Sequence, residues 1–243
     1  MNKPKDEYST KFEKTISSKE RHTKGQYFTH KDIVNFILDN IPIKNNSKVL
    51  DPTCGAGAFL CKLNKKNILQ ENIYGSDIDP RAILLCNENL GDSGNIIRGD
   101  FIKKELFEEN YFDVIIGNPP FQSMSKKKKT FPSGHKHFSP ILNGAINSSS
   151  LVMIRSYFLL KENGYLGFVL PKNFVRVDSF KKIRDFILEH MQIILIKDLD
   201  HHFKDVRCDQ IILIAQKKKP DLNKNLKVIT YKKYLSFLNQ EFY

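Results

Sequence analysis

Short apolar runs alternate with amphipathic stretches along most of the chain. The runs are rich in Ile, Val and Leu and are bounded by turn residues, which is typical of strands buried on both faces of a parallel sheet. The last two runs have no helix between them, so we expect an antiparallel hairpin there, with the loop 201–209 at its tip. The alternation predicts an α/β fold of the Rossmann-like kind, with a mostly parallel seven-stranded sheet and a C-terminal antiparallel hairpin. The predicted strands are Lys48–Asp51, Ile73–Asp77, Asn95–Arg98, Asp113–Gly117, Tyr165–Leu170, Gln192–Ile196 and Gln210–Ala215. One predicted helix begins near Asp32, and the others cover Ala56–Lys65, Pro80–Asn89, Ile146–Leu160 and Ser179–His190.

Length and composition fit one domain with a small extension. The chain has 243 residues, of which 40% are hydrophobic and 27% charged, enough to bury one full core. We expect a basic arm at residues 1–24, one catalytic domain at 25–219 and a tail at 220–243 that is too short for a target recognition domain. The N-terminus lacks an apolar core, and the four cysteines form no CxxC pair. These features indicate a soluble cytoplasmic protein with no metal site and no membrane span.

Positive charge is concentrated in the second half of the chain. The net charge is +12, and residues 122–243 hold 22 basic and 10 acidic residues. Such an asymmetry indicates a polyanionic partner beside that half. The alternative is a lysine-rich solvated surface with no specific partner.

The sequence VLDPTCGAGAFL, residues 49–60, predicts a strand followed by a glycine turn that opens a helix. Glycines there let the backbone pass close to a ligand. The turn lacks the Gly-Lys-Ser/Thr end of a P-loop, and Leu60 replaces the third glycine of a dinucleotide fingerprint. Asp51 at the strand tip suits a cationic group such as an ammonium or a sulfonium, although such turns also serve packing alone.

The next two strands also end in acidic residues. Asp77 stands about 20 residues beyond Gly57, the position from which a carboxylate accepts hydrogen bonds from ribose hydroxyls. Asp79-Pro80 is expected to cap the helix that follows. Asp100 and Phe101 at the third strand end suit an adenine, and Asp100 as a helix cap is the alternative.

The fourth strand ends in the most specific motif, Asn-Pro-Pro-Phe, within FDVIIGNPPF at residues 112–121. Two prolines forbid further ladder bonding and stiffen the turn. The Asn118 side chain and the Pro119 carbonyl can then aim at one point, with the Phe121 ring alongside. Two acceptors and a flat apolar face match a planar group that bears an NH₂.

Five motifs follow one another along the chain: GQYFT at 25–29, DPTCGAG at 51–57, the acidic Asp77, Asp100-Phe101, and NPPF at 118–121. In this order they resemble the catalytic domain of the gamma class of N6-adenine DNA methyltransferases from restriction-modification systems. The resemblance covers residues 25–219, with His30 in place of the proline that usually follows GQYFT. The target recognition domain that family members commonly carry is missing, which leaves the DNA sequence specificity open.

The resemblance implies S-adenosylmethionine as cofactor and DNA as substrate, with methyl transfer to adenine N6 after the base is flipped out. A separate target-recognition subunit and a cognate restriction endonuclease are the candidate partners, and neither a metal nor a membrane is implied. The implied cofactor contacts are Gln26, Tyr27, Phe28, Thr29, Asp51, Thr53, Gly55, Gly57, Asp77, Ile78, Asp100, Phe101 and Asn118. The implied catalytic residues are Asn118, Pro119, Pro120 and Phe121. The implied substrate contacts are Phe121, Phe203, Lys126, Lys127, Lys128 and Lys129.

Two other functions use the same motifs. One is methylation of RNA or of a protein glutamine through the same Asn-Pro-Pro-Phe turn. The other is a cofactor-binding subunit that needs a partner chain for recognition. The GQYFT motif and the basic second half favour DNA.

Overall fold

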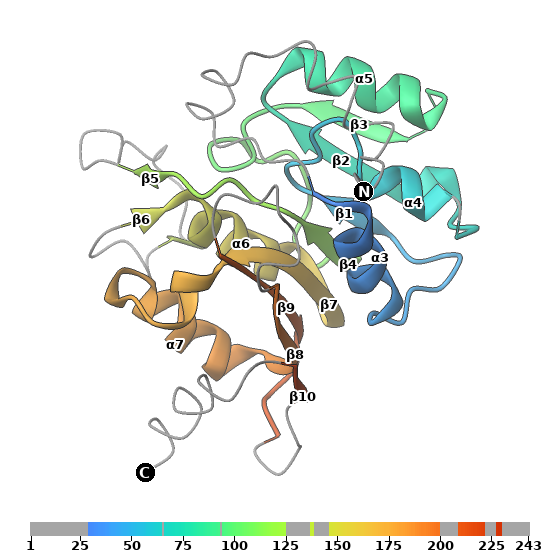
Figure 1. Ribbon diagram of the computed structural model, residues 1–243. Coiled ribbons are helices and arrows are strands. Elements are labelled where there is room, and N and C mark those ends of the chain that lie inside the picture. Colours follow the sequence, from blue (N-terminus) through green and yellow to red (C-terminus); the bar gives the residue numbers. More distant parts are fainter. Residues whose placement is uncertain are drawn as a thin grey trace, which may run out of the picture.

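An eight-stranded sheet forms the centre of the protein (Figure 1). The computed structural model describes residues 29–64, 66–92, 94–124, 137–138, 146–199, 209–221 and 227–229. The spatial order of the strands is β10-β8-β9-β7-β4-β1-β2-β3. The strands are β1 (Val49–Asp51), β2 (Ile73–Asp77), β3 (Asn95–Arg98), β4 (Phe112–Gly117), β7 (Leu160–Pro171), β8 (Gln192–Asp198), β9 (Gln210–Gln216) and β10 (Lys227–Ile229).

Only β9 runs against its neighbours in this sheet. It pairs antiparallel with both β7 and β8, whereas the other neighbouring pairs are parallel. The predicted mostly parallel fold with a C-terminal antiparallel hairpin is therefore confirmed. β10, which was not expected, lies in the stretch taken from the sequence as a tail and adds an eighth strand next to β8.

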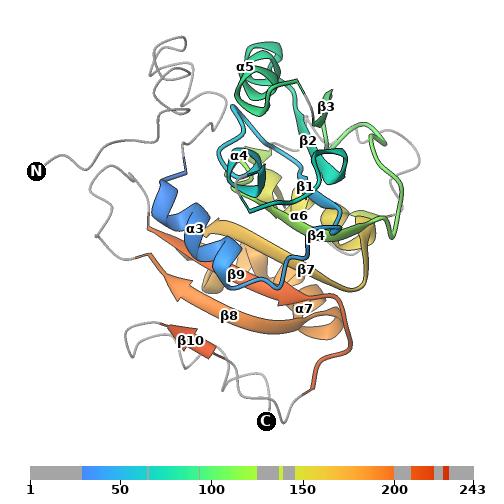
Figure 2. The ribbon, with the colours of Figure 1, turned by 90° about the vertical axis from the view of Figure 1, so that its right-hand side faces the viewer.

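Helices cover both faces of the sheet (Figure 2). One face packs against α3 (Lys31–Asp39), α4 (Leu60–Asn64) and α5 (Pro80–Leu90), and the other against α6 (Ser148–Leu159) and α7 (Lys181–His190). Successive residues of β4 point to opposite faces of the sheet. Val114 and Ile116 pack in the core on the side of α3, α4 and α5, and Ile115 packs in the core on the side of α6 and α7. This two-sided burial explains the continuous apolar runs of the sequence.

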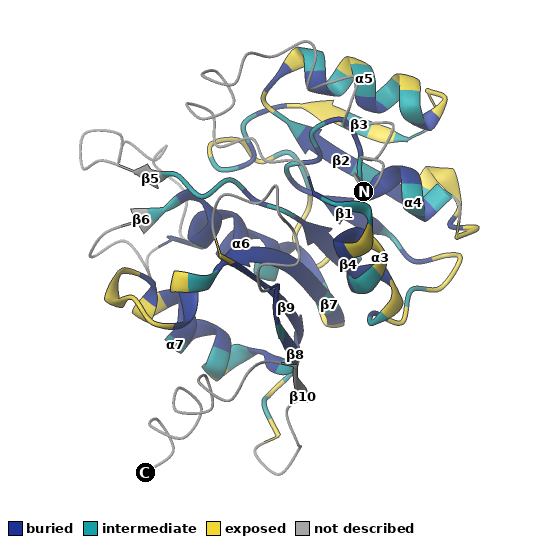
Figure 3. Ribbon diagram, in the orientation of Figure 1, coloured by how far each residue is buried: buried dark blue, intermediate teal, exposed yellow. Residues whose placement is uncertain are grey.

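The central strands β4 and β9 are almost entirely buried, and β3 at the edge is largely exposed (Figure 3). Every residue of β1 is buried. Strands packed on both faces hold their carboxyl ends in fixed positions. No helix among the residues that the structure describes is long and apolar enough to cross a lipid bilayer.

Three predicted helix starts are wrong. The helix expected from Ser179 begins at Lys181, because Asp178–Phe180 forms a 3₁₀ turn. The helix expected from Ala56 begins at Leu60, because Gly55 and Gly57 have positive φ values of 54° and 89° and prolong the turn. The helix expected from Ile146 begins at Ser148, because Ile146–Asn147 forms β6, which pairs antiparallel with β5 (Ser123–Met124). Short 3₁₀ turns lie at Gln70–Asn72, Lys172–Val175 and Asp178–Phe180.

Helix caps explain why α3 and α5 begin where the sequence predicts. His30, which occupies the position of the family's usual proline, accepts a hydrogen bond from the Asp32 N–H at the start of α3. Asp79 accepts from the Arg81 N–H, with Pro80 at the first helical position of α5. The predicted capping role of Asp79-Pro80 is confirmed.

Candidate active site

The carboxyl ends of β1, β2, β3 and β4 meet along one edge of the sheet, because these four strands are parallel neighbours. Asp51 is the last residue of β1 and Asp77 the last of β2. Asp100 follows β3 by two residues, and Asn118 directly follows β4. The structure thus brings the four strand-end motifs to one place, where open α/β sheets usually bind their ligands.

Asp77 connects the tip of β2 to the glycine turn after β1. Its Oδ2 accepts a hydrogen bond from the Gly55 N–H at 3.0 Å, and its Oδ1 accepts from the Asp79 N–H at 2.9 Å. Burial raises the pKa of Asp77, and these backbone bonds act in the opposite direction. The carboxylate is therefore held in one orientation before any ligand arrives.

The two glycines of the turn have different uses. A Cβ atom on Gly55 would meet nothing within 4 Å, so the positive φ alone accounts for a glycine there. A Cβ atom on Gly57 would lie 2.9 Å from Cys86 Sγ on α5. Gly57 thus allows the turn to pack closely against α5, while Gly55 presents its N–H to Asp77.

Asp51 is a buried carboxyl, 2% exposed. Its Oδ1 accepts a hydrogen bond from the Thr53 N–H at 3.1 Å. Burial raises the pKa of Asp51 to about 8, and the neighbouring Asp77 adds to the rise. A cationic group bound beside Asp51 would stabilise its charged form and lower this pKa.

β1 and β4 approach each other closely where they end. A Cβ atom on Gly117 would lie 2.7 Å from Asp51 Oδ1, so only a glycine allows β4 to pass this carboxyl. Asn118 comes next in the chain. The close approach places the Asn118 turn beside the Asp51 carboxyl.

Two buried polar atoms at these adjacent strand ends have no hydrogen-bond partner within the described part of the chain. They are Thr53 Oγ1 and Asn118 Oδ1. The Asn118 amide nitrogen is occupied, since Nδ2 donates to Thr29 Oγ1 at 3.2 Å. Because a buried polar group without a partner costs free energy, such atoms in a site indicate ligand contacts.

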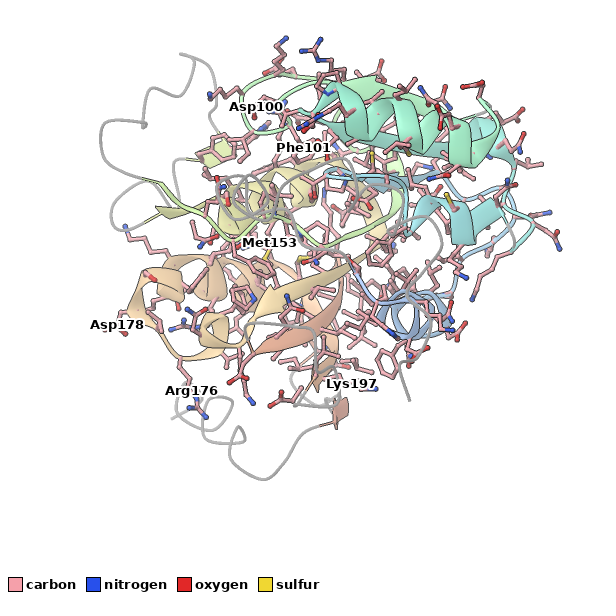
Figure 4. All side chains as sticks on the ribbon, turned by 45° about the horizontal axis from the view of Figure 1, so that its top comes forward. Asp100, Phe101, Met153, Arg176, Asp178 and Lys197 are labelled. Carbon is pink, nitrogen blue, oxygen red and sulfur yellow. The ribbon has the colours of Figure 1, made fainter. Side chains whose placement is uncertain are left out.

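Asp100 and Phe101 lie on the loop that follows β3 (Figure 4). Asp100 Oδ1 accepts hydrogen bonds from the N–H groups of Ile102 and Lys103. Asp100 therefore acts as a cap, as the alternative interpretation expected, but it caps a turn and not a helix. Phe101 is only 4% exposed and packs in the same core cluster as Met153. Its ring therefore offers little free surface to an adenine, whereas the Ile78 side chain at the tip of β2 is 60% exposed.

Arg155 of α6 supports this loop and was not singled out from the sequence. Its side chain is 3% exposed, its Nη1 donates to the Ile102 carbonyl at 3.2 Å, and its guanidinium lies 5.4 Å from the Phe101 ring centroid. A charged residue within the otherwise apolar and serine-rich SSSLVMIRSYFL was the available signal. Ser148, at the start of the same helix, hydrogen-bonds the segment after Asn118 and carried no sequence signal.

The Asn-Pro-Pro-Phe turn is partly buried. Pro119 is buried, and the Phe121 ring packs partly against the core cluster that includes α3. Eight of the implied site residues lie outside the described residues, namely Gln26, Tyr27, Phe28, Lys126, Lys127, Lys128, Lys129 and Phe203. No group of three or more His, Cys, Asp or Glu side chains in the described ranges is arranged to hold a metal ion.

The fold is shared with known methyltransferases. A solved structure of a putative class I S-adenosylmethionine-dependent methyltransferase from Listeria monocytogenes superposes with a TM-score of 0.64 at 23% identity, over 86% of this chain and 67% of that one. The molecule thus has the Rossmann-like methyltransferase fold.

The family follows from the sequence comparisons. The model of the N-6 DNA Methylase family matches residues 6–240, so the chain belongs to this family. It is 30% identical over 216 residues to the Type II methyltransferase M.CvrRI of Paramecium bursaria Chlorella virus XZ-6E, over 87% of this chain and 53% of that protein. It is 29% identical over 218 residues to the Type II methyltransferase M.VspI of Vibrio sp. (strain 343), over 86% and 52%. The chain spans about half the length of these curated relatives.

Proposed function

We propose that this protein transfers a methyl group from S-adenosylmethionine to the N6 atom of adenine in DNA. The observation that carries the proposal is the buried Asn118 Oδ1, which has no hydrogen-bond partner among the described residues. Asn118 directly follows Gly117, the residue at which the end of β4 passes the Asp51 carboxyl. An acceptor kept free at this point suits an incoming NH₂ group. Membership of the N-6 DNA Methylase family and the names of the Type II relatives support the same reaction.

The residues at the ends of β1 and β2 fit the cofactor. Bound S-adenosylmethionine supplies an electrophilic methyl group on a sulfonium. The buried Asp51 carboxyl, with its pKa raised to about 8, would be stabilised in its charged form by a cationic ligand. The unpartnered Thr53 Oγ1 offers a further polar contact. Asp77, already oriented by Gly55, has acceptor capacity left for ribose hydroxyls.

Asn118 and its turn would hold the target base. Adenine N6 is a poor nucleophile because its lone pair is delocalised into the ring. Acceptors at Asn118 Oδ1 and the Pro119 carbonyl would hold both N–H bonds and align the nitrogen for in-line attack. Flipping the base out of the duplex costs a few kcal/mol, and stacking on the Phe121 ring would return part of it.

Binding to DNA would rest mainly on charge. The basic surplus of residues 122–243 suits phosphate contacts, which give affinity without sequence readout. We therefore propose that residues 25–219 form the catalytic domain and that base-sequence recognition comes from a module outside them. A target-recognition subunit or a cognate restriction endonuclease would then be the partner.

The test uses labelled S-adenosylmethionine and three substrates in parallel: unmethylated genomic DNA, total RNA and cell protein. We expect label in DNA, and N6-methyladenine on mass spectrometry of the digested product. Label in RNA or in protein glutamine instead would contradict the proposal and support the other methyl acceptors. Cofactor binding without transfer to any of the three would indicate a subunit that needs its partner.

A further inference from the structure

Ser148, the first residue of α6, makes three hydrogen bonds to the segment that follows Asn118. Its hydroxyl donates to the Pro120 carbonyl at 2.5 Å and accepts from the Gln122 N–H at 2.9 Å. Its own N–H donates to the Gln122 carbonyl at 2.9 Å. The three bonds bracket Phe121, the residue between Pro120 and Gln122.

The Ser148 hydroxyl is not needed to cap its own helix. The cap of α6 is Asn147, whose Oδ1 accepts from the Ser149 N–H at 2.9 Å and from the Ser149 hydroxyl at 2.8 Å. The Ser148 hydroxyl is thus directed to the turn after β4 and not to the helix end. Ser148 is also 5% exposed, so water does not readily replace these bonds.

The turn depends on outside support because prolines cannot supply it. Pro119 and Pro120 have no N–H, so this part of the chain cannot continue the hydrogen-bond ladder of β4. α6, in contrast, is buried continuously from Ser148 to Ser156 and is fixed in the core. The pairing of β5 with β6 extends the same attachment beyond Gln122.

We infer that Ser148 is a positioning residue for methyl transfer, which anchors the Pro120–Gln122 backbone to α6 and thereby sets the direction of the Phe121 ring and of the turn that carries Asn118. The inference rests on the proposed function, in which that ring and that amide hold the flipped base. Misplacement of reacting groups by about 1 Å costs up to about 100-fold in rate. Loss of one anchoring side chain should therefore act on the rate more than on cofactor affinity.

The kinetic test compares Ser148→Ala with Ser150→Ala in single-turnover assays on unmethylated genomic DNA with labelled S-adenosylmethionine. Ser150 is the matched control, since it lies on the same helix, is 5% exposed, and has a hydroxyl without a partner in the described residues. We expect Ser148→Ala to lower the rate at saturating cofactor by about tenfold, with cofactor affinity changed less than about twofold. Ser148→Thr keeps the hydroxyl and should recover most of the rate, whereas Ser150→Ala should match the wild type.

A second measurement does not depend on activity. The chain contains no tryptophan, so Phe121→Trp places a single tryptophan in the turn, which can be excited at wavelengths where the nine tyrosines do not absorb. Adding Ser148→Ala to this variant should lower the tryptophan anisotropy and increase its quenching by acrylamide, and adding Ser150→Ala should change neither. In the wild-type protein, the Gln122 amide should be protected from hydrogen exchange, because it donates to a buried hydroxyl.

The outcomes separate this inference from the proposed function. Two results would overturn the role of Ser148. One is that Ser148→Ala methylates DNA at the same rate as an active wild-type protein. The other is that the Gln122 amide exchanges its hydrogen as fast as an unstructured peptide. Absence of methyl transfer by the wild type would count against the proposed function alone. The reporter and exchange measurements would then still decide whether Ser148 anchors the turn.

Discussion

Two regions of the site differ in how their polar side chains are paired. The cofactor side, defined as the ends of β1, β2 and β3, carries three carboxyl groups, and each accepts at least one backbone N–H from the next turn. The base side, defined as the turn Asn118–Phe121, keeps its amide oxygen free of partners within the described residues. The carboxylate bonds come from Thr53 to Asp51, from Gly55 and Asp79 to Asp77, and from Ile102 and Lys103 to Asp100.

The difference follows from acceptor capacity. A carboxylate has two oxygens with about four lone-pair positions, so backbone bonds can orient it and still leave positions for a ligand. An asparagine has one carbonyl oxygen with two lone-pair positions, so a bond from the chain would take half of the positions open to the substrate. The base side is therefore oriented through its amide nitrogen, by Thr29, and through its backbone, by Ser148.

The largest effect should come from removing the free acceptor. Asn118→Ala is expected to lower the single-turnover rate of methyl transfer by about 100- to 1,000-fold, because the proposed role of the amide is to hold the attacking nitrogen. Cofactor affinity by calorimetry should stay near the wild type. Asn95→Ala, on the exposed edge strand, is the matched control. Retained activity in Asn118→Ala would show that this turn does not hold the target base.

Loss of an oriented carboxylate should act on binding instead. Asp77→Ala is expected to weaken cofactor binding by about 1.5–3 kcal/mol, the range for a lost charged hydrogen bond, or about 10- to 150-fold. The rate at saturating cofactor should change much less. Asp185→Ala removes a carboxylate from the exposed face of α7 and should leave affinity unchanged. Unchanged affinity in Asp77→Ala would place the ribose elsewhere.

The buried Asp51 predicts a pH dependence of folding stability. Its pKa is raised from 3.8 to about 8 in the folded protein, so the folded chain binds more protons than the unfolded chain between about pH 4 and pH 8. The free energy of unfolding should therefore fall as pH rises through this window and level off above it. Denaturant unfolding of the wild type and of Asp51→Asn across the window checks this, because the neutral amide lacks this contribution. Parallel curves for the two proteins would show that the carboxyl does not carry the shift.

Arg155→Lys should have the smallest effect. Lysine keeps the charge but loses the planar donor group that reaches the Ile102 carbonyl beside the Phe101 ring. We expect cofactor affinity to weaken by about 1 kcal/mol, or about fivefold, with little change in the rate at saturation. Arg98→Lys on the exposed β3 is the matched control. A large fall in rate at unchanged affinity would mean that Arg155 acts on the base side instead.

Much of the site could be predicted because parallel strands share one edge. Asp51, Asp77, Asp100 and Asn118 each follow an apolar run, and the strand order alone brings their positions together. The same argument could not predict which contacts each side chain makes. Phe101, expected to face an adenine, is buried against α6, and this depends on a helix about 50 residues further along the chain.

The sequence by itself determined the α/β class, seven of the eight strands of the central sheet and the family, since these depend on local patterns of apolar residues and on short motifs. The tertiary structure decided the late start of α4, the addition of β10 and the pairs that orient the site. Those pairs join Gly55 to Asp77, Pro120 to Ser148 and Ile102 to Arg155, over 22, 28 and 53 residues. Hydrogen bonds between such distant residues depend on how helices and strands pack, and packing is a property of the whole fold that no local pattern contains.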